Sequence, residues 1–417
     1  MILLLKAAKI IDESSPFHNQ IKDLLLKNGI IQKISDSIKT PKNCKEINIE
    51  NLHISQGWFD SSVCFGEPGF EERETILNGL KTASKSGFTA VAVNPNTQPA
   101  ADNKSAIEFM INKSNGAATK LYPIGNFTKN AEGKDIAELF DMQNSGAIAF
   151  GDYNKAIANA NLLKIGLQYA QNFDGLLLSF PQDNSIAGSG LVNEEVNSTK
   201  LGLKGIPSLA EEMQVARDLF LLEYTGGKLH IPTISTAKSV ELIKNAKKKG
   251  LKVSCSVAAH HLILTDSELK EFDANTKILP PLRTIKDTKA LVKGINTGTI
   301  DMITSDHNPI DVEHKKVEFN NAKFGTIGLE SLFGAVNNVL DLETLISAIT
   351  IRAKKPFNIE SYSIAEGNKA ELTLFNPART YIFKEENILS TSKNAIFHNK
   401  KMKGIVYGVI ANNIATI

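Results

Sequence analysis

The sequence predicts an α/β fold, namely a TIM-like (β/α)8 barrel with a small β-sandwich domain. Between about residue 60 and about residue 306, short β-branched or apolar runs alternate with longer amphipathic stretches, as in repeated βα units around a parallel sheet. Eight such runs occur, which favours a closed barrel over an open doubly wound sheet. Both ends of the chain are instead rich in short strand-like runs with Asn-Gly and similar turns.

The strand candidates follow one another along the middle of the chain. They are HISQGWFDSSV, FTAVAVNP, KLYPIGN, AIAFGD, GLLLSF, KLHIPTIS, KVSCSVAAH and IDMITSD. Helices are expected between them, for example in EERETILNGLKTASKSG and TAKSVELIKNAKKKG, which both end on a glycine that can cap a helix. The irregular stretch 181–207 predicts a long loop over the top of the barrel. Segments 1–55 and 361–417 are expected to meet as one sandwich, and residues 56–360 to form the barrel.

Composition favours a small-molecule or protein partner. The chain has 47 Lys and Arg against 45 Asp and Glu, and the net charge of +2 gives no electrostatic reason to expect nucleic acid or a membrane surface. The three cysteines, Cys44, Cys64 and Cys255, are too few for a disulfide framework and typical of a reducing compartment. The opening MILLLKAAKIID is apolar over too few residues for a signal peptide or a membrane span, so we expect a first strand in a cytoplasmic protein.

Several long stretches resemble the dihydroorotases of the cyclic amidohydrolase family, in its longer bacterial type. They occur in matching order and include LLKNGIIQKIS, GWFDSSVCFGEPGFEERETILNGL, LGLKGIPSLAEEMQVARDL, PPLR, GTIDMITSDHNP and FGTIGLESLF. The resemblance implies hydrolysis or closure of a cyclic amide on two zinc ions held at the C-terminal ends of barrel strands. Such a site needs neutral imidazoles and a carboxylate, because water bound to the metal must be acidified to hydroxide.

At the first strand, the residues that the family uses for metal and substrate are replaced. The family has Asp-x-His-x-His, then an aromatic or aliphatic residue and an arginine that binds the substrate carboxylate. The corresponding residues here are Asp60, Ser62, Cys64, Phe65 and Gly66. Both imidazoles and the arginine are therefore absent.

The later strands continue this pattern. By the resemblance, the second of the paired aspartates after the family's fourth strand bridges the metals, and the pair corresponds to Asp152 and Tyr153. The fifth-strand histidine corresponds to Phe180, and the sixth-strand histidine to Thr233. Of the metal-binding residues that the resemblance implies beyond the first strand, only Asp306 after the eighth strand is unchanged.

Of the other positions at which the family contacts its substrate, some are retained here and some are replaced. Asn96 matches the family, as does the turn 324–325, whereas Leu279 replaces an asparagine and Ile310 stands where a histidine is common. Four histidines lie near strand ends but outside the family's ligand set, so we expect packing or hydrogen-bonding roles for His230, His260, His261 and His307.

These replacements predict a barrel without zinc and without dihydroorotase chemistry. Carboxylates that converge without a cation repel one another in a partly buried space, whereas Tyr153 removes one charge and Phe180 fills volume. The chain then resembles bacterial relatives that lack zinc ligands and serve as non-catalytic partners of aspartate carbamoyltransferase, the preceding enzyme of pyrimidine synthesis. By this resemblance we expect assembly with such a catalytic chain, and we also expect a homo-oligomer.

The alternative is an altered hydrolase of a cyclic amide that uses the remaining groups. In such an enzyme, Asp306 would act as a base or Cys64 would act as a nucleophile. Alternatively, a new metal site would form from four side chains, namely those of Asp60, Cys64, Asp152 and Asp306. A cysteine needs a neighbouring base or cation to become a thiolate, and the neighbours of Cys64 are acidic or neutral. A small apolar filler is the simpler interpretation of Cys64.

Overall fold

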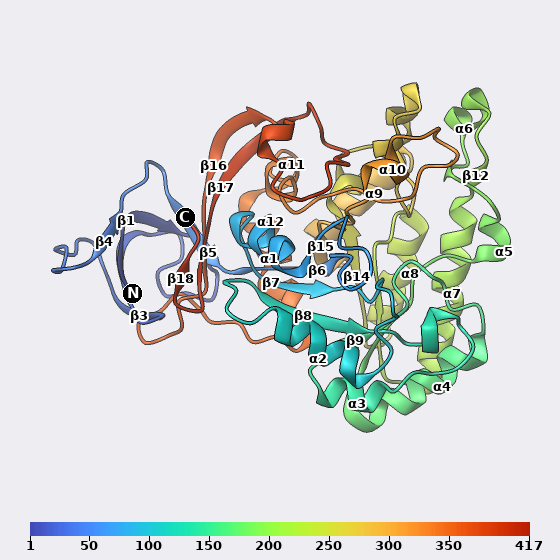
Figure 1. The fold of residues 1–417 in the computed structure, drawn as a ribbon, viewed down its shortest axis with the longest axis horizontal. Coiled ribbons are helices and arrows are strands. Elements are labelled where there is room, and N and C mark those ends of the chain that lie inside the picture. The colour runs from blue at the N-terminus through green and yellow to red at the C-terminus, as the bar shows by residue number, and fades with distance from the viewer.

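The computed structural model describes residues 1–269 and 272–417 in full, and within them the chain forms a parallel barrel beside a mixed sheet (Figure 1). The barrel sheet has the strand order β15-β14-β13-β10-β9-β8-β7-β6. Its strands are β6 (Trp58–Val63), β7 (Phe88–Val93), β8 (Lys120–Gly125), β9 (Ala149–Phe150), β10 (Leu176–Leu178), β13 (Lys228–Ile231), β14 (Val253–Ala258) and β15 (Met302–Thr304). Every residue of β6, β7 and β14 is buried, as expected for parallel strands covered on both faces.

The barrel closes between its first and last strands. Val63 forms an isolated parallel bridge with His307, and the Cys64 amide donates to the His307 carbonyl at 2.7 Å. This closure places the end of β6 beside the end of β15, which confirms the predicted barrel architecture.

Helices surround the barrel at its outer face. The main ones are α1 (Ile76–Lys85), α2 (Lys104–Lys113), α3 (Leu139–Asn144), α4 (Ala160–Ala170), α7 (Ser208–Thr225), α8 (Ala237–Lys248), α9 (Ile285–Asn296) and α12 (Leu342–Ile349). Thr75 and Thr236 cap the first turns of α1 and α8 by accepting from backbone amides. The predicted capping glycines, Gly87 and Gly250, follow these two helices with φ of 95° and 83°.

Shorter elements connect the main ones. They are α5 (Asn184–Ala187), α6 (Val196–Leu201), α10 (Val312–Lys315), α11 (Leu332–Val336), α13 (Ile351–Lys354), the strands β11 (Val192–Asn193) and β12 (Gly205–Ile206), and 3-10 turns at Lys129–Ala131, Gln171–Phe173, Ala259–Leu262, Asp266–Glu271, Ala274–Thr276, Lys355–Phe357 and Glu385–Asn387. The stretch 181–207 is therefore more ordered than the predicted loop. It holds α5, α6 and the parallel pair of β11 and β12, because side chains such as Asp183 cap its short helices.

The two ends of the chain share the second sheet, with the order β18-β17-β16-β5-β1-β2-β3 and β4 paired to β1. Its strands are β1 (Ile2–Ile10), β2 (Ile21–Lys27), β3 (Ile30–Ser35), β4 (Lys45–Ile47), β5 (His53–Gln56), β16 (Leu372–Ile382), β17 (Lys401–Ala411) and β18 (Ile414–Ala415). Antiparallel pairing of β5 with β16 joins the terminal segments, as predicted. This second sheet has its own buried core, which includes Leu5, Ile54 and Leu374.

The predicted first barrel strand, HISQGWFDSSV, is divided between the two sheets. The chain leaves the terminal sheet after β5 and enters the barrel at β6, and Gly57 lies at the crossing. A Cβ atom at Gly57 would lie 2.0 Å from Thr89 Oγ1, so the close approach requires glycine. The Trp58 ring then packs against Phe333 and Phe375, at centroid distances of 4.9 and 5.6 Å, so Phe375 of β16 belongs to the core of the barrel. Among the fully described residues, no helix is both long and apolar enough to cross a membrane.

Candidate functional site

The C-terminal ends of the barrel strands surround one small cavity. Its volume is about 20 Å³, close to the space that a single water molecule requires. Six residues that the sequence predicts for the site line it together: Ser62, Tyr153, Phe180, Thr233, Leu279 and Asp306. Five of them lie in or shortly after different barrel strands, whose ends meet at one rim of a parallel barrel, and Leu279 lies in the loop after the 3-10 turn Ala274–Thr276.

Three of these residues have an uncommon backbone conformation. Tyr153, Thr233 and Asp306 have φ of 55°, 50° and 49°, in the left-handed region that non-glycine residues rarely adopt. For the β-branched Thr233 this conformation is particularly unfavourable, and a residue in this region typically costs about 1–2 kcal/mol. Such strain is found most often at functional sites. The backbone at the rim of the barrel therefore has the strained conformation that is typical of functional sites, although its side chains differ from those of the family's metal site.

Asp306 is the buried carboxylate that faces the cavity. Its Oδ1 accepts from Ser62 Oγ at 3.2 Å, and Ser62 Oγ in turn accepts from Asn94 Nδ2 at 2.9 Å. Burial and, to a smaller extent, the nearby Asp60 together raise the pKa of Asp306 from 3.8 to about 7, against the lowering effect of the hydrogen bond from Ser62. This carboxyl group can therefore hold a proton near neutral pH.

Asp60 clamps the barrel rather than facing the cavity. It is fully buried and accepts from the amides of Ser62 and Ser305 at 3.0 and 2.9 Å, and from the Thr304 hydroxyl. Burial raises its pKa, although these three hydrogen bonds from residues of β6 and the end of β15 favour the charged form. Its contacts join the first strand to the last, so Asp60 has a structural role.

Asp152 is directed away from the cavity. Its carboxylate accepts from Asn126 Nδ2 at 3.2 Å and from the Thr128 amide and hydroxyl at 3.1 and 2.5 Å. Burial raises its pKa as well. Tyr153 lines the cavity instead, and the pKa of its phenol is raised well above the usual range by desolvation and by the nearby Cys64 and Asp306.

Cys64, Gly66 and Asn96 lie beside the cavity but do not line it. Burial, together with Asp306, raises the pKa of the Cys64 thiol to about 12, so this thiol is a poor nucleophile. Gly66 has φ of 66°, and a Cβ atom there would lie 2.5 Å from the Phe70 carbonyl oxygen. The buried Oδ1 of Asn96 has no hydrogen-bond partner among the described residues.

The histidines outside the predicted ligand set are packed elsewhere. His230 Nδ1 lies 2.8 Å from Ser254 Oγ, and burial lowers its pKa to about 3. His260 and His261 sit in the 3-10 turn after β14, where His261 Nε2 lies 3.1 Å from the Pro280 carbonyl oxygen. His307 Nδ1 accepts from the Gly328 amide at 3.1 Å. These four side chains do not line the cavity.

Asn94 is a site residue that the sequence reasoning missed. It follows β7, lines the cavity and donates to Ser62 Oγ, whereas the sequence comparison drew attention to Asn96 two residues later. Its place in the sequence could have predicted this role, because a polar residue directly after a barrel strand lies at the C-terminal rim of the barrel.

The donors around the cavity do not fit the two-zinc centre that the resemblance implies. Zinc prefers imidazole, thiolate and carboxylate ligands, whereas the cavity presents Asp306 with hydroxyl groups and the rings of Tyr153 and Phe180. Across the part of the chain that the structure describes, no three His, Cys, Asp or Glu residues gather closely enough to hold a metal ion.

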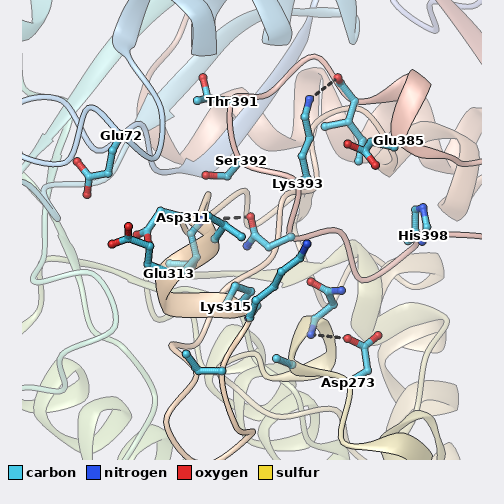
Figure 2. Close-up of a pocket in the computed structure, with 18 of the residues that line it drawn as sticks. Glu72, Asp273, Asp311, Glu313, Lys315, Glu385, Thr391, Ser392, Lys393 and His398 are labelled. Carbon is cyan, nitrogen blue, oxygen red and sulfur yellow. Dashed lines mark hydrogen bonds between the residues drawn. The ribbon is translucent and has the colours of Figure 1, made fainter.

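A much larger groove lies outside the barrel mouth, with a volume of about 790 Å³. Figure 2 shows acidic side chains such as Glu313 and Glu385 beside basic ones such as Lys315 and Lys393. Lys315 Nζ donates to the carbonyls of Gly325, Lys323 and Lys277 at 2.7, 2.9 and 3.3 Å, and burial lowers its pKa to about 7. The cation thus serves to hold a loop. Of the positions that the resemblance relates to substrate, Ile310 lines this groove, and none of the residues that line the barrel cavity do.

Comparison with known proteins identifies the family. A Dihydro-orotase-like family model matches residues 53–239, and an Amidohydrolase family model matches residues 192–413. Proteins named dihydroorotase from Syntrophus aciditrophicus and Acetivibrio thermocellus are 37% and 36% identical over 413 and 417 residues, which cover 97% and 98% of this chain and 97% of each relative. A third, from Geobacter metallireducens, is 35% identical over 97% of this chain and 96% of its own length.

Solved structures show the same fold at lower identity. The L-hydantoinase (dihydropyrimidinase) of Arthrobacter aurescens superposes with a TM-score of 0.85 at 18% identity, covering 100% of this chain and 96% of its own. The dihydropyrimidinase of Brevibacillus agri gives 0.84 at 18% identity, with 100% and 95% coverage. With relatives above 30% identity along nearly the whole chain, this protein belongs to the dihydroorotase family of amidohydrolases.

Proposed function

We propose that this protein is a non-catalytic, metal-free member of the dihydroorotase family that acts as a structural partner of aspartate carbamoyltransferase. The observation that supports the loss of catalysis is the 20 Å³ volume of the barrel-mouth cavity. Pockets that bind small molecules measure about 300–1,000 Å³, so a ring substrate would need the mouth to open. Phe180 and Leu279 occupy space there, and Phe180 is only 4% exposed.

The chemistry of the mouth also supports this proposal. Hydrolysis of a cyclic amide needs an activated water and a group that stabilises the developing negative charge. The family's arginine position is Gly66, and its imidazole positions are Ser62, Cys64, Phe180 and Thr233. The thiol of Cys64 stays protonated at neutral pH, since its pKa is about 12.

One observation favours the second candidate, an altered hydrolase. Asp306 has a pKa of about 7, which suits a general acid or base at neutral pH. Ser62 donates a hydrogen bond to Asp306 and accepts one from Asn94, so hydrogen bonds link three polar side chains at the rim of the barrel. The altered hydrolase would act on a cyclic amide through these side chains.

A combined metal and activity measurement distinguishes the two candidates. The purified protein, expressed with added zinc, is submitted to elemental analysis and assayed with dihydroorotate in the directions of hydrolysis and ring closure. We expect less than stoichiometric zinc, no turnover, and no difference between the wild type and Asp306→Asn. One tightly held zinc ion, or turnover that Asp306→Asn abolishes, would favour the altered hydrolase and overturn the proposal.

A restoration variant provides the positive control. It combines Ser62→His, Cys64→His, Phe180→His and Thr233→His with Tyr153→Asp, which returns the family's ligand types to the unchanged backbone. We expect this variant to bind more zinc than the wild type, because the strand ends still meet at one cavity. Equal zinc contents in the two proteins would mean that the backbone, and not the side chains, excludes the metal.

The role as partner is tested separately. The protein is mixed at low salt with the aspartate carbamoyltransferase catalytic chain from the same organism, and the mixture is followed by sedimentation velocity. We expect a joint complex and a change in the assembly of the catalytic chain. Two independent boundaries would rule out the partnership, without bearing on whether the barrel is catalytic.

A further inference from the structure

A second cavity lies at the end of the barrel opposite the mouth. Its volume is about 160 Å³. A cavity of roughly 150 Å³ is large enough to hold a benzene-sized ligand. Thr89 and Lys120 line it near the starts of β7 and β8, Lys354 lines it at the end of α13, and Asn412 lines it after β17. The cavity therefore lies between the N-terminal ends of barrel strands and the terminal sheet, and it shares no lining residue with the mouth.

Lys354 is a buried cation in the wall of this cavity. It is only 2% exposed, and among the described residues its ammonium group makes no hydrogen bond and no ion pair. Burial lowers the pKa of Lys354, against the raising effect of the nearby Glu371 and Asp12. A buried lysine is normally paired, because an uncompensated buried charge is strongly unfavourable. Within the described chain this charge is offset only at longer range, which favours an anionic ligand group in direct contact with it.

Glu371 brings the opposite charge to the same cavity. It lines the cavity just before β16, and its carboxylate accepts no hydrogen bond from the residues that the structure describes. Asp12, the other carboxylate near the lysine, already accepts from Gln56 Nε2 and from the Ile364 amide at 2.9 and 2.8 Å. Lys354 and Glu371 therefore face one space as opposite charges that are not in contact with each other. A ligand with both an anionic and a cationic group would match them.

The exposed residues that line the cavity add one cation. Lys369 Nζ donates to the Tyr362 hydroxyl at 2.9 Å, and this hydroxyl donates to Glu360, so these three polar groups satisfy one another. Lys120 Nζ instead lies over the Tyr122 ring, 4.6 Å from its centroid, and pairs with no carboxylate of the described residues. The entrance of the cavity is therefore more favourable for a negative than for a positive group.

We propose that this cavity binds a free α-amino acid, whose carboxylate pairs with Lys354 and whose ammonium group pairs with Glu371. An α-amino acid carries both charges on one carbon atom, so a compact ligand can satisfy both side chains through charge-assisted hydrogen bonds. Lys120 at the entrance favours an acidic side chain on the ligand over a basic one. The inference does not depend on the proposed function, because the cavity and the barrel mouth have no residue in common.

Isothermal titration calorimetry on the purified full chain tests the proposal with L-aspartate, L-alanine, L-lysine and succinate. We expect one L-aspartate per chain, weaker binding of L-alanine and the weakest binding of L-lysine, because Lys120 attracts an acidic side chain and repels a basic one. Succinate is L-aspartate without its ammonium group, so we expect it to bind at least about 10-fold more weakly. The proposal would be overturned if neither L-aspartate nor L-alanine binds at millimolar concentration, or if succinate binds as tightly as L-aspartate.

Two substitutions test whether the ligand binds in this cavity. Lys354→Met removes a charge at nearly constant volume and Glu371→Gln removes the other, and each should weaken L-aspartate binding by about 10-fold or more. Glu371→Gln should also reduce the difference between L-aspartate and succinate, and it tests the site even if Lys354→Met disturbs folding, because Glu371 is only partly buried. Lys293→Met is the matched control, since Lys293 is exposed on α9, and it should bind as the wild type does. Unchanged binding in both cavity variants would place the ligand elsewhere and overturn the proposal.

Discussion

Phe180 and Phe220 are the same residue type in opposite settings. Phe180 follows β10 and is 4% exposed in the barrel mouth, whereas Phe220 on α7 is 71% exposed on the outer wall. In a barrel enzyme the mouth is normally open to substrate, and the outward side of each helix is normally polar. Here the mouth is packed and part of the wall is apolar. The surface suited to recognition therefore lies outside the barrel rather than at its mouth.

The largest effect is expected at Asp306, whose buried carboxyl group faces the packed mouth. Its pKa is about 7 in the folded protein and 3.8 in the unfolded chain, so the folded state retains a proton that the unfolded chain releases. The resulting stabilisation is complete below pH 3.8 and is lost as the pH rises through 7. Asp306→Asn carries no charge at any pH, so we expect its advantage in unfolding free energy over the wild type to grow by up to roughly 4 kcal/mol between these values.

Chemical denaturation at a series of pH values, with a chelator present to remove stray metal, measures this difference. Subtraction of the two curves cancels the other titrating groups. If the difference in unfolding free energy between the wild type and Asp306→Asn stays constant across this pH range, Asp306 ionises with an ordinary pKa. The carboxyl group would then be more hydrated than its burial indicates.

Phe180→Ala should have the next largest effect, because it removes a buried ring. Truncation of a buried phenylalanine typically costs about 3 kcal/mol or more of unfolding free energy, through lost apolar burial and the cavity that remains. Phe180→Leu should cost much less, since it preserves most of the volume. Urea denaturation measures both variants. A loss below about 1 kcal/mol for Phe180→Ala would show that the ring is dispensable and that the mouth can open easily.

Adjacent serines allow a finer test of the rim. Ser62 Oγ donates to Asp306 and accepts from Asn94, whereas the buried Ser61 Oγ has no hydrogen-bond partner among the described residues. Ser62→Ala should cost about 1 kcal/mol and raise the pKa of Asp306 further, because it removes a donor to the charged form. Ser61→Ala should be neutral or stabilising. Equal losses in the two variants would argue against the polar chain at the rim.

The sequence predicted the barrel because eight apolar runs recur between amphipathic stretches, and the terminal sheet because both chain ends are rich in strands. It did not predict where the sheets divide. HISQGWFDSSV is apolar on both sides of Gly57, so its pattern is the same whether the run belongs to one sheet or to two. Likewise, the short strands β11 and β12 hold only two residues each, too few to produce a period.

The candidate site was predictable to a similar degree. The strand ends that meet at one rim could be named from the sequence, and six of the named residues line the cavity. The sequence could not show that Asp60 and Asp152 point toward backbone amides and hydroxyl groups, since this depends on how neighbouring loops fold. The sequence also did not predict that apolar side chains of α7 are exposed, because a helix with apolar residues on several sides can equally be buried.

The smallest effect is expected for Phe220→Ala, and it completes the comparison of the two phenylalanines. In the monomer, measured at high dilution, the substitution should change the unfolding free energy by less than about 0.5 kcal/mol, because the ring makes few contacts to lose. Urea denaturation of Phe220→Ala beside Phe180→Ala therefore separates an exposed ring from a buried one. A loss of about 1 kcal/mol or more for Phe220→Ala would show that this ring stabilises the single chain, and the outer wall would then resemble the mouth.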